Sequence, residues 1–182
     1  MARFKYLDEE DVAPEHRAHM REINLTRILF HHPELARLSN EHAMYIRNKG
    51  KLDPRLREMA ILQVGYLARS PYEYSHHVKI GMDFGVSEAD IRAIAEETAG
   101  RPTTLDPLAK AVLKAARELA GEIKLSDATF AVLQQHLDTP RILELLDAIC
   151  SYCGTVRMLA ALQIDIEPEY QVYLDRFPLP KN

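Results

Sequence analysis

Four polar residues between positions 58 and 77 have the types and the spacing that proton chemistry uses. Glu58 is followed by Ser70, Glu73 and His77, which stand 12, 15 and 19 residues further along the chain. Glu73 and His77 are four residues apart, so they share one face if this stretch is helical. An imidazole titrates near pH ~6.5, and a neighbouring carboxylate can exchange a proton with it, so the pair could act as a general acid and base.

These residues fall on two predicted helices. Asp53 and Pro54 predict a helix start, because aspartate caps the first backbone N–H groups and proline fits the first helical position. The segment from Ser70 to Glu73 predicts a second start with a capping box. In that arrangement the Ser70 hydroxyl accepts from the Glu73 N–H, and the Glu73 carboxylate accepts from the Ser70 N–H. Gly85 is the expected stop of the second helix.

The stretch resembles the carboxymuconolactone decarboxylase / alkylhydroperoxidase D-like superfamily, over roughly residues 30–165. The peroxidase branch carries a relay glutamate, then Cys-x-x-Cys at a helix start, then a histidine four residues after the second cysteine. Glu58 and His77 match the glutamate and the histidine, whereas Ser70 and Glu73 stand at the two cysteine positions. The chain therefore resembles the branch that lacks the Cys-x-x-Cys pair.

The resemblance implies lyase- or decarboxylase-type acid/base chemistry on a small organic acid or lactone, with no cofactor. A metal ion is not expected, because no His-x-x-x-His pair or second histidine cluster accompanies the possible ligands Glu58, Glu73, His76 and His77. Glu58 and His77 would move the proton, and Glu73 would tune or share it. Loss of carbon dioxide leaves a carbanion or enolate, which such a pair can protonate. The expected substrate-binding residues are Ser70, Tyr74 and Arg69.

Each of these residues also has a purely structural interpretation. Glu58 could be a solvated carboxylate near a helix N-terminus, paired with Arg55. Glu73 could serve only in the capping box, and His77 could pack in the core or at an interface. His76 lies about 100° further round the helix and is expected at the surface or an interface.

Two further residues bear on the shape of the site. Gly65, seven positions after Glu58, has no side chain and could leave open space over the same helix face. Arg57 is, with Arg69, a candidate for holding a substrate carboxylate, although an arginine on an amphipathic helix is usually solvated.

Cys150 and Cys153 form a Cys-x-x-Cys sequence in the middle of a predicted helix. No helix N-terminus lowers their pKa there, so two small buried hydrophobic residues are expected. A thiol-based alkylhydroperoxidase, of the antioxidant kind also called peroxiredoxin-like, is the second hypothesis, and it would need these thiols to reach His77. The third hypothesis is a non-catalytic oligomeric helical module.

Composition limits the class of protein. The chain has 182 residues, of which 47% are hydrophobic, and a net charge of −4 with scattered basic residues. That balance argues against nucleic-acid binding, and we expect no membrane span and no signal peptide. The interpretation is a cytoplasmic protein, and the resemblance implies a homo-oligomer such as a dimer, trimer or hexamer.

The predicted architecture is all-α, a single compact domain of seven or eight helices with the alkylhydroperoxidase D-like fold. The expected parts are an N-terminal extension at 1–13, loosely packed, a helical domain at 14–165 and a C-terminal arm at 166–182. Helices are predicted over roughly 14–30, 33–49, 54–67, 71–84, 88–98, 107–120, 127–137 and 139–162. Leu52-Asp53-Pro54 recurs as Leu105-Asp106-Pro107, which suggests an internal helical duplication.

Overall fold

The computed structural model describes residues 1–180, and that part of the chain is all-α, as predicted. Its α-helices are α1 (Pro14–Arg17), α2 (Asn24–Leu29), α3 (Pro33–Asn48), α4 (Pro54–Leu67), α5 (Pro71–Asp83), α6 (Glu88–Thr98), α7 (Pro107–Glu122), α8 (Asp127–His136), α9 (Thr139–Leu162) and α10 (Gln171–Arg176). Two 3₁₀ turns, η1 (Glu9–Asp11) and η2 (Pro168–Tyr170), flank them. The number of helices exceeds the predicted seven or eight because both ends of the chain contain short helices.

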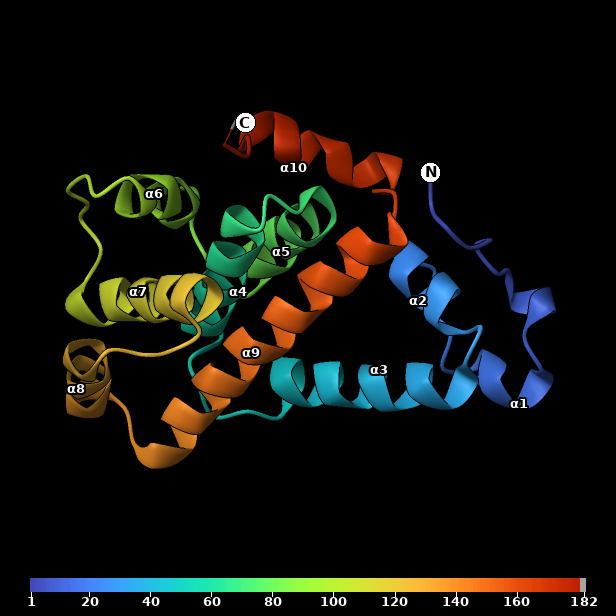
Figure 1. Ribbon diagram of the computed structural model, residues 1–182, viewed down its shortest axis with the longest axis horizontal. Coiled ribbons are helices and arrows are strands. Elements are labelled where there is room, and N and C mark those ends of the chain that lie inside the picture. The colour runs from blue at the N-terminus through green and yellow to red at the C-terminus, as the bar shows by residue number, and fades with distance from the viewer. Residues whose placement is uncertain (181–182) are drawn as a thin grey trace.

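Helix α4 is the centre of the molecule. It packs against α5, α6, α7 and α9, and every residue from 56 to 65 is buried. A helix buried on all sides is expected to be apolar throughout. α4 departs from that rule at three buried polar positions, Arg57, Glu58 and Gln63. In Figure 1, α6, α7 and α8 lie on one side of α4 and α5, α1 to α3 lie on the other, and α9 crosses between them.

Local capping sets most of the helix starts. The side chains of Asp53, Ser70, Ser87, Asp106 and Ser126 each accept from a backbone N–H in the first turn of the following helix. Gly85 follows α5 with φ +92, a left-handed conformation that glycine adopts readily. These boundaries confirm the predicted helices from residue 33 to residue 162. The internal duplication stays a prediction.

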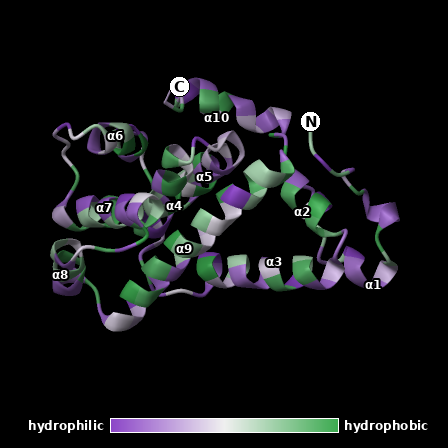
Figure 2. Cartoon of the chain, viewed as in Figure 1, coloured by the Kyte–Doolittle hydropathy of each residue, from purple (hydrophilic) through white to green (hydrophobic). Residues whose placement is uncertain are grey.

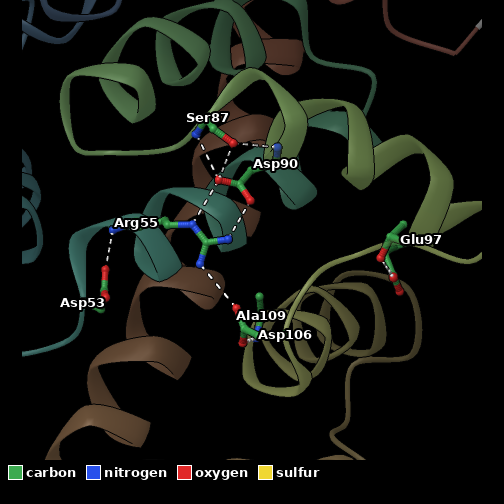
Figure 3. A network of polar contacts seen from close by, with 8 residues as sticks. Asp53, Arg55, Ser87, Asp90, Glu97, Asp106 and Ala109 are labelled. Atoms are coloured by element: carbon green, nitrogen blue, oxygen red, sulfur yellow. Dashed lines mark hydrogen bonds and ion pairs between the residues drawn. The ribbon is translucent and has the colours of Figure 1, made fainter.

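Arg55 joins the starts of three helices. Its guanidinium donates to Asp90 through Nε (3.0 Å) and Nη2 (2.6 Å), and its Nη1 lies 3.6 Å from Asp106 (Figure 3). Asp90 belongs to the capping box of α6, and Asp106 caps α7. Arg55 therefore pairs with these residues and not with Glu58, and this ionic link fixes how α4, α6 and α7 meet.

The N-terminal region differs from the prediction in its helices. The single helix expected over 14–30 is broken into α1 and α2, because the backbone N–H of Asn24 donates to Glu167 (2.6 Å) across the fold and a new helix begins there. The extension at 1–13 contacts the rest of the chain at two points. Arg3 donates a backbone hydrogen bond to Leu162, and Val12 is buried with Phe30.

The C-terminal arm returns to the domain and covers α5. Helix α10 packs on α5, and Phe177 is buried in the main core. The arm thus contains the turn η2 and the short helix α10. Residues 181–182 of the predicted arm lie outside the described residues.

Helix α9 is long and apolar enough to cross a membrane by length and composition, contrary to the expected absence of such a run. Core helices of water-soluble proteins pass the same test. Hydrophobic residues recur along α9 in Figure 2, and its inward side contributes Leu145, Ile149 and Val156 to the main core. The packing of its inward side in the core thus explains why α9 is apolar.

Gly65 does not leave open space over Glu58, because it is where α4 and α5 approach each other. A Cβ atom at this position would meet the backbone N and Cα of Tyr74, both at 3.3 Å. The opposing atoms belong to a helix backbone that cannot swing away, so the contact can be relieved only by moving α5.

We expect Gly65→Ala to destabilise the protein by roughly 1–3 kcal/mol, because overpacking outweighs the better helix propensity of alanine. Urea unfolding measures the change. The matched control is Gly121→Ala in α7, where a new Cβ meets nothing within 4 Å. Equal effects of the two substitutions would contradict the close approach at Gly65.

Candidate active site

The predicted proton-handling residues come together on two neighbouring helices. Glu58 lies in the second turn of α4, and Glu73 and His77 lie one turn apart on α5. All three side chains are almost fully buried, with exposed fractions of 1%, 3% and 4%. Burial of ionisable groups in a core is unfavourable unless they pair, so their arrangement decides whether the fold can hold them.

His77 is flanked by a carboxylate on each side of its ring. Its Nδ1–H donates to Glu58 Oε2 at 2.6 Å, and its Nε2 lies 3.0 Å from Glu73 Oε1. Arg57 completes the group, because its Nε and Nη2 lie 2.9 and 2.8 Å from Glu58 Oε1. Two carboxylates, one guanidinium and one imidazolium make a set without net charge.

The carboxylates hold His77 in its charged form. Burial alone would lower the pKa of His77, but the facing Glu58 and Glu73 outweigh burial and raise it from 6.5 to about 9. Burial would likewise raise the pKa of Glu58, but His77 and Arg57 outweigh burial and lower it. At neutral pH the site therefore holds an imidazolium against an ionised Glu58, which is the form that can donate a proton.

His77 and Glu73 border a cavity of about 430 Å³, a volume typical of small-molecule sites. The cavity lies between α2, α3, α5 and α9, whose arrangement is visible in Figure 1. Glu58 is not among the lining residues. It sits behind His77 and reaches the cavity through the imidazole, so only two of the three predicted residues can touch a ligand there.

The capping box predicted at Ser70 and Glu73 is only half formed. The Ser70 hydroxyl accepts from the Glu73 N–H at 3.4 Å, as expected. The Ser70 N–H donates instead to the Gly65 carbonyl, and the Glu73 carboxylate faces His77. Glu73 Oε1 is buried and has no aligned hydrogen-bond donor among the described residues. The carboxylate is thus directed into the site.

His76 is buried, contrary to the expected surface or interface position. Its ring is stacked between Tyr72 and Tyr170, with centroids 4.2 and 3.6 Å away, and its Nδ1–H donates to the Tyr72 carbonyl. Its Nε2 lies 3.1 Å from Glu167 Oε2. Glu167 also accepts from the Asn24 N–H and the Tyr72 hydroxyl. A second histidine–glutamate pair therefore lies beside the first, and its histidine, His76, lines the cavity.

The residues predicted to bind substrate lie away from this cavity. Tyr74 is buried against Tyr66, with ring centroids 5.9 Å apart, and Ser70 caps α5. Arg69 is exposed at the turn between α4 and α5 with φ 48. Arg57 is buried in its contacts with Glu58 and the Arg47 carbonyl, so it is not available to hold a substrate carboxylate.

The two cysteines are not the buried pair expected from the sequence. Cys150 is exposed and Cys153 is partly buried at the edge of the main core, whereas Ile149 and Tyr152 are buried in it. Burial raises the pKa of Cys153 above its usual value. Neither cysteine lines the cavity. Within residues 1–180, no group of three or more histidine, cysteine, aspartate or glutamate side chains is arranged to hold a metal ion.

Sequence reasoning missed four residues of this region: Arg21, Arg47, Tyr152 and Glu167. The Tyr152 ring meets His77 edge-on at 4.8 Å, and both arginines line the cavity. None has a partner close in the sequence, so no local spacing could have revealed them. Tyr152 stands between Cys150 and Cys153, and the Cys-x-x-Cys pattern indicates thiol chemistry but gives no sign of a role for the tyrosine.

The sequence and the fold match known proteins. Residues 33–118 match the model of the carboxymuconolactone decarboxylase family. No curated protein matches the chain. Among solved structures, the alkylhydroperoxidase AhpD core of an uncharacterised peroxidase-related protein from Ralstonia eutropha has a TM-score of 0.80 and 16% identity, and covers 95% of each chain.

A second solved structure is the debrominase Bmp8, as a cysteine-to-alanine variant in complex with 2,3,4-tribromopyrrole. It has a TM-score of 0.83 and 18% identity, covering 97% of this chain and 100% of that one. A protein of unknown function from Agrobacterium tumefaciens has a TM-score of 0.66 and 17% identity, covering 77% and 95%. At these identities the matches show a shared fold.

The raised pKa of His77 predicts how stability depends on pH. The folded protein binds the His77 proton more tightly than the unfolded chain does. The contribution of this proton to the free energy of unfolding is therefore complete below pH 6.5 and is lost as the pH rises through the pKa of about 9. We expect a loss of up to roughly 3 kcal/mol across this window in urea unfolding.

The control for this pH dependence is His77→Gln, which we expect to show little of the loss. An NMR titration of His77 in the wild-type protein gives the same pKa independently if the variant does not fold. Unchanged wild-type stability between pH 6.5 and 9 would rule out the charged imidazole.

Glu167 is expected to hold the C-terminal arm in place. Glu167→Gln removes the charge that faces His76 and weakens the acceptor of the Asn24 N–H. We therefore expect the free energy of unfolding, measured with urea, to fall by roughly 1–3 kcal/mol. Limited proteolysis should cut the arm sooner. Glu169→Gln, on an exposed neighbour in the same segment, is the matched control and should change neither measurement.

Proposed function

From its membership of the carboxymuconolactone decarboxylase / alkylhydroperoxidase D-like superfamily, we propose that this chain is an enzyme that uses His77 for acid/base chemistry of the lyase or decarboxylase type. The observation that carries the proposal is the imidazolium held between Glu58 and Glu73 at the wall of a cavity. The proposed substrate is a small organic acid or lactone, and no cofactor takes part in the proposed steps.

The proposed step begins with cleavage of a carbon–carbon bond in the substrate. Carbon dioxide leaves, and the electron pair of that bond stays on the substrate as a carbanion or enolate. The proton on His77 Nε2, which faces the cavity beside Glu73, then passes to that carbon and leaves a neutral imidazole. Glu58 keeps Nδ1 protonated and fixes the ring, and a proton from solvent restores the imidazolium.

The pairing of buried charges supports chemistry over a purely structural role. A helix cap needs only the Ser70 hydroxyl, yet Glu73 turns its carboxylate towards the cavity and leaves one oxygen without an aligned donor. A buried, incompletely satisfied carboxylate is unfavourable for stability and is found more often where a ligand completes the site. The alternative of a non-catalytic helical module offers no reason for this arrangement.

A thiol-based peroxidase is the second candidate, because Cys150 is exposed and the intervening Tyr152 touches His77. Reduction of a hydroperoxide would oxidise two thiols to a disulfide and release an alcohol and water. Activity in a hydroperoxide assay that is lost in the Cys150→Ser/Cys153→Ser double variant would favour this candidate. Decarboxylase activity that is unchanged in the same variant would favour the first.

Two further parts of the proposal concern assembly and location. We propose a homo-oligomer, supported by exposed apolar side chains on α3 and α9: Leu35, Leu38, Tyr45 and Leu143. A cytoplasmic location is the accompanying proposal. Light scattering gives the number of subunits.

The test of the proposed function is carbon dioxide release from a panel of small lactones and keto acids. We expect His77→Gln to lower kcat by roughly 10²–10⁴-fold, since general acid catalysis contributes that much. His136→Gln, on the exposed side of α8, is the matched control. Equal turnover by His77→Gln and the control would remove His77 from the mechanism.

The pH dependence of kcat offers a separate check. Because His77 donates the proton, activity should fall as the pH rises through about 9, where the imidazolium loses its charge. Glu58→Gln removes a carboxylate that raises this pKa, so the fall should move to lower pH. If kcat falls at the same pH in the wild type and in Glu58→Gln, the assigned role of Glu58 is contradicted.

A further inference from the structure

The cavity that holds His77 also has two arginines in its wall. Arg21 precedes α2, and Arg47 lies in the last turn of α3. Both come from elements on the N-terminal side of the fold, whereas His77 and Glu73 belong to α5. The cavity therefore has a proton-handling part and a cationic part.

Neither arginine has an anionic partner in residues 1–180. No carboxylate lies within ion-pair distance of either guanidinium, and Arg47 Nε is buried without a hydrogen-bond acceptor. Arg57, by contrast, has an anionic partner, because its Nη2 lies 2.8 Å from Glu58 Oε1. A buried donor left without an acceptor is unfavourable and is expected to bind one when a ligand enters.

The two guanidinium groups also act on each other. Burial lowers the pKa of Arg21, and the positive charge of Arg47 lowers it further. Both groups nevertheless keep their charge, because arginine does not lose its proton in proteins. Two like charges in a partly enclosed space repel, and an anion placed between them would relieve that repulsion.

Tyr152 connects the cationic part of the cavity to His77. Its ring meets the His77 ring edge-on at 4.8 Å, and Arg47 interacts with its hydroxyl. An anion at Arg47 would consequently lie about one tyrosine ring away from the imidazole, within the span of a small organic molecule.

We propose that Arg21 and Arg47 form a carboxylate-binding subsite, which orients the ligand so that its reacting carbon faces His77 and Glu73. The inference rests on the proposed function and narrows it. The carboxylate held by the arginines is stabilised where it is, so it is not the group that leaves as carbon dioxide.

The cavity surface between these two parts is compatible with such a ligand. Apolar side chains, Leu25, Ile46 and Met158, line it together with the charged residues. A compact carbon skeleton with an anionic group at one end would contact the apolar surface with its body and the arginines with its carboxylate. A guanidinium binds a carboxylate through two parallel hydrogen bonds, which fixes the direction of the ligand.

The experiment compares benzoate with benzamide, which have the same ring but differ in charge. Binding is followed by saturation-transfer NMR at millimolar concentrations with wild-type protein, Arg21→Gln, Arg47→Gln and Arg47→Lys. We expect benzoate to bind the wild type at least ~10-fold more tightly than benzamide, and each glutamine variant to remove that preference. Arg47→Lys should recover part of it, because lysine keeps the charge but not the planar fork.

The matched control is Arg37→Gln, which removes the same charge from the same helix. Arg37 is partly exposed, pairs with Glu34 and Glu41, and does not line the cavity, so benzoate binding should be unchanged. Circular dichroism of each variant verifies that the helices are intact. The subsite is overturned if benzoate does not bind, if benzoate and benzamide bind equally, or if Arg37→Gln weakens binding as much as Arg47→Gln.

One further variant separates this inference from the proposed function. His77→Gln lies outside the subsite, so it should keep the preference for benzoate while losing decarboxylase turnover. Preference for benzoate in a wild type that turns over no member of the substrate panel would refute the proposed chemistry and leave the subsite standing. If the wild type turns over a member of the panel but binds benzoate no better than benzamide, the proposed chemistry stands and the subsite is refuted.

Discussion

The structure depends on the neutral group of charges between α4 and α5. Arg57, Glu58, His77 and Glu73 are buried together, and the cost of burying each charge is offset by the opposite charges beside it. Their distances leave little freedom, because a shift of α5 along α4 would separate His77 from Glu58. The close approach at Gly65 has the same consequence, since it determines how near the two helices can lie.

Helix α5 is held on two sides by its consecutive histidines. His77 pairs with Glu58 of α4, while His76, about 100° further round the helix, pairs with Glu167 of the C-terminal arm. Both imidazoles border the same cavity. The groups that position the proposed acid are thus connected to the groups that close the fold over α5, and ligand binding and arm position are expected to influence each other.

Most helix boundaries could be predicted because they depend on residues within one turn. Asp53, Ser87 and Asp106 cap their helices as their sequences indicate. The failures occur where a distant residue takes over a local hydrogen bond. Glu167 accepts the Asn24 N–H and interrupts the predicted helix at 14–30, and His77 takes the Glu73 carboxylate that the capping box would have used. Tertiary contacts of this kind compete with local ones and have no signature in the sequence nearby.

The sequence by itself determined which side chains are available: the glutamate Glu58, the histidine His77, and Ser70 and Glu73 between them. It also determined that they lie on two consecutive helices, since periodicity and capping are local properties. Only the tertiary structure decided which groups face the cavity. Glu58 lies behind His77, Arg57 pairs with Glu58, and Arg21 and Arg47 line the cavity, because helix packing brings together residues that no short-range pattern relates.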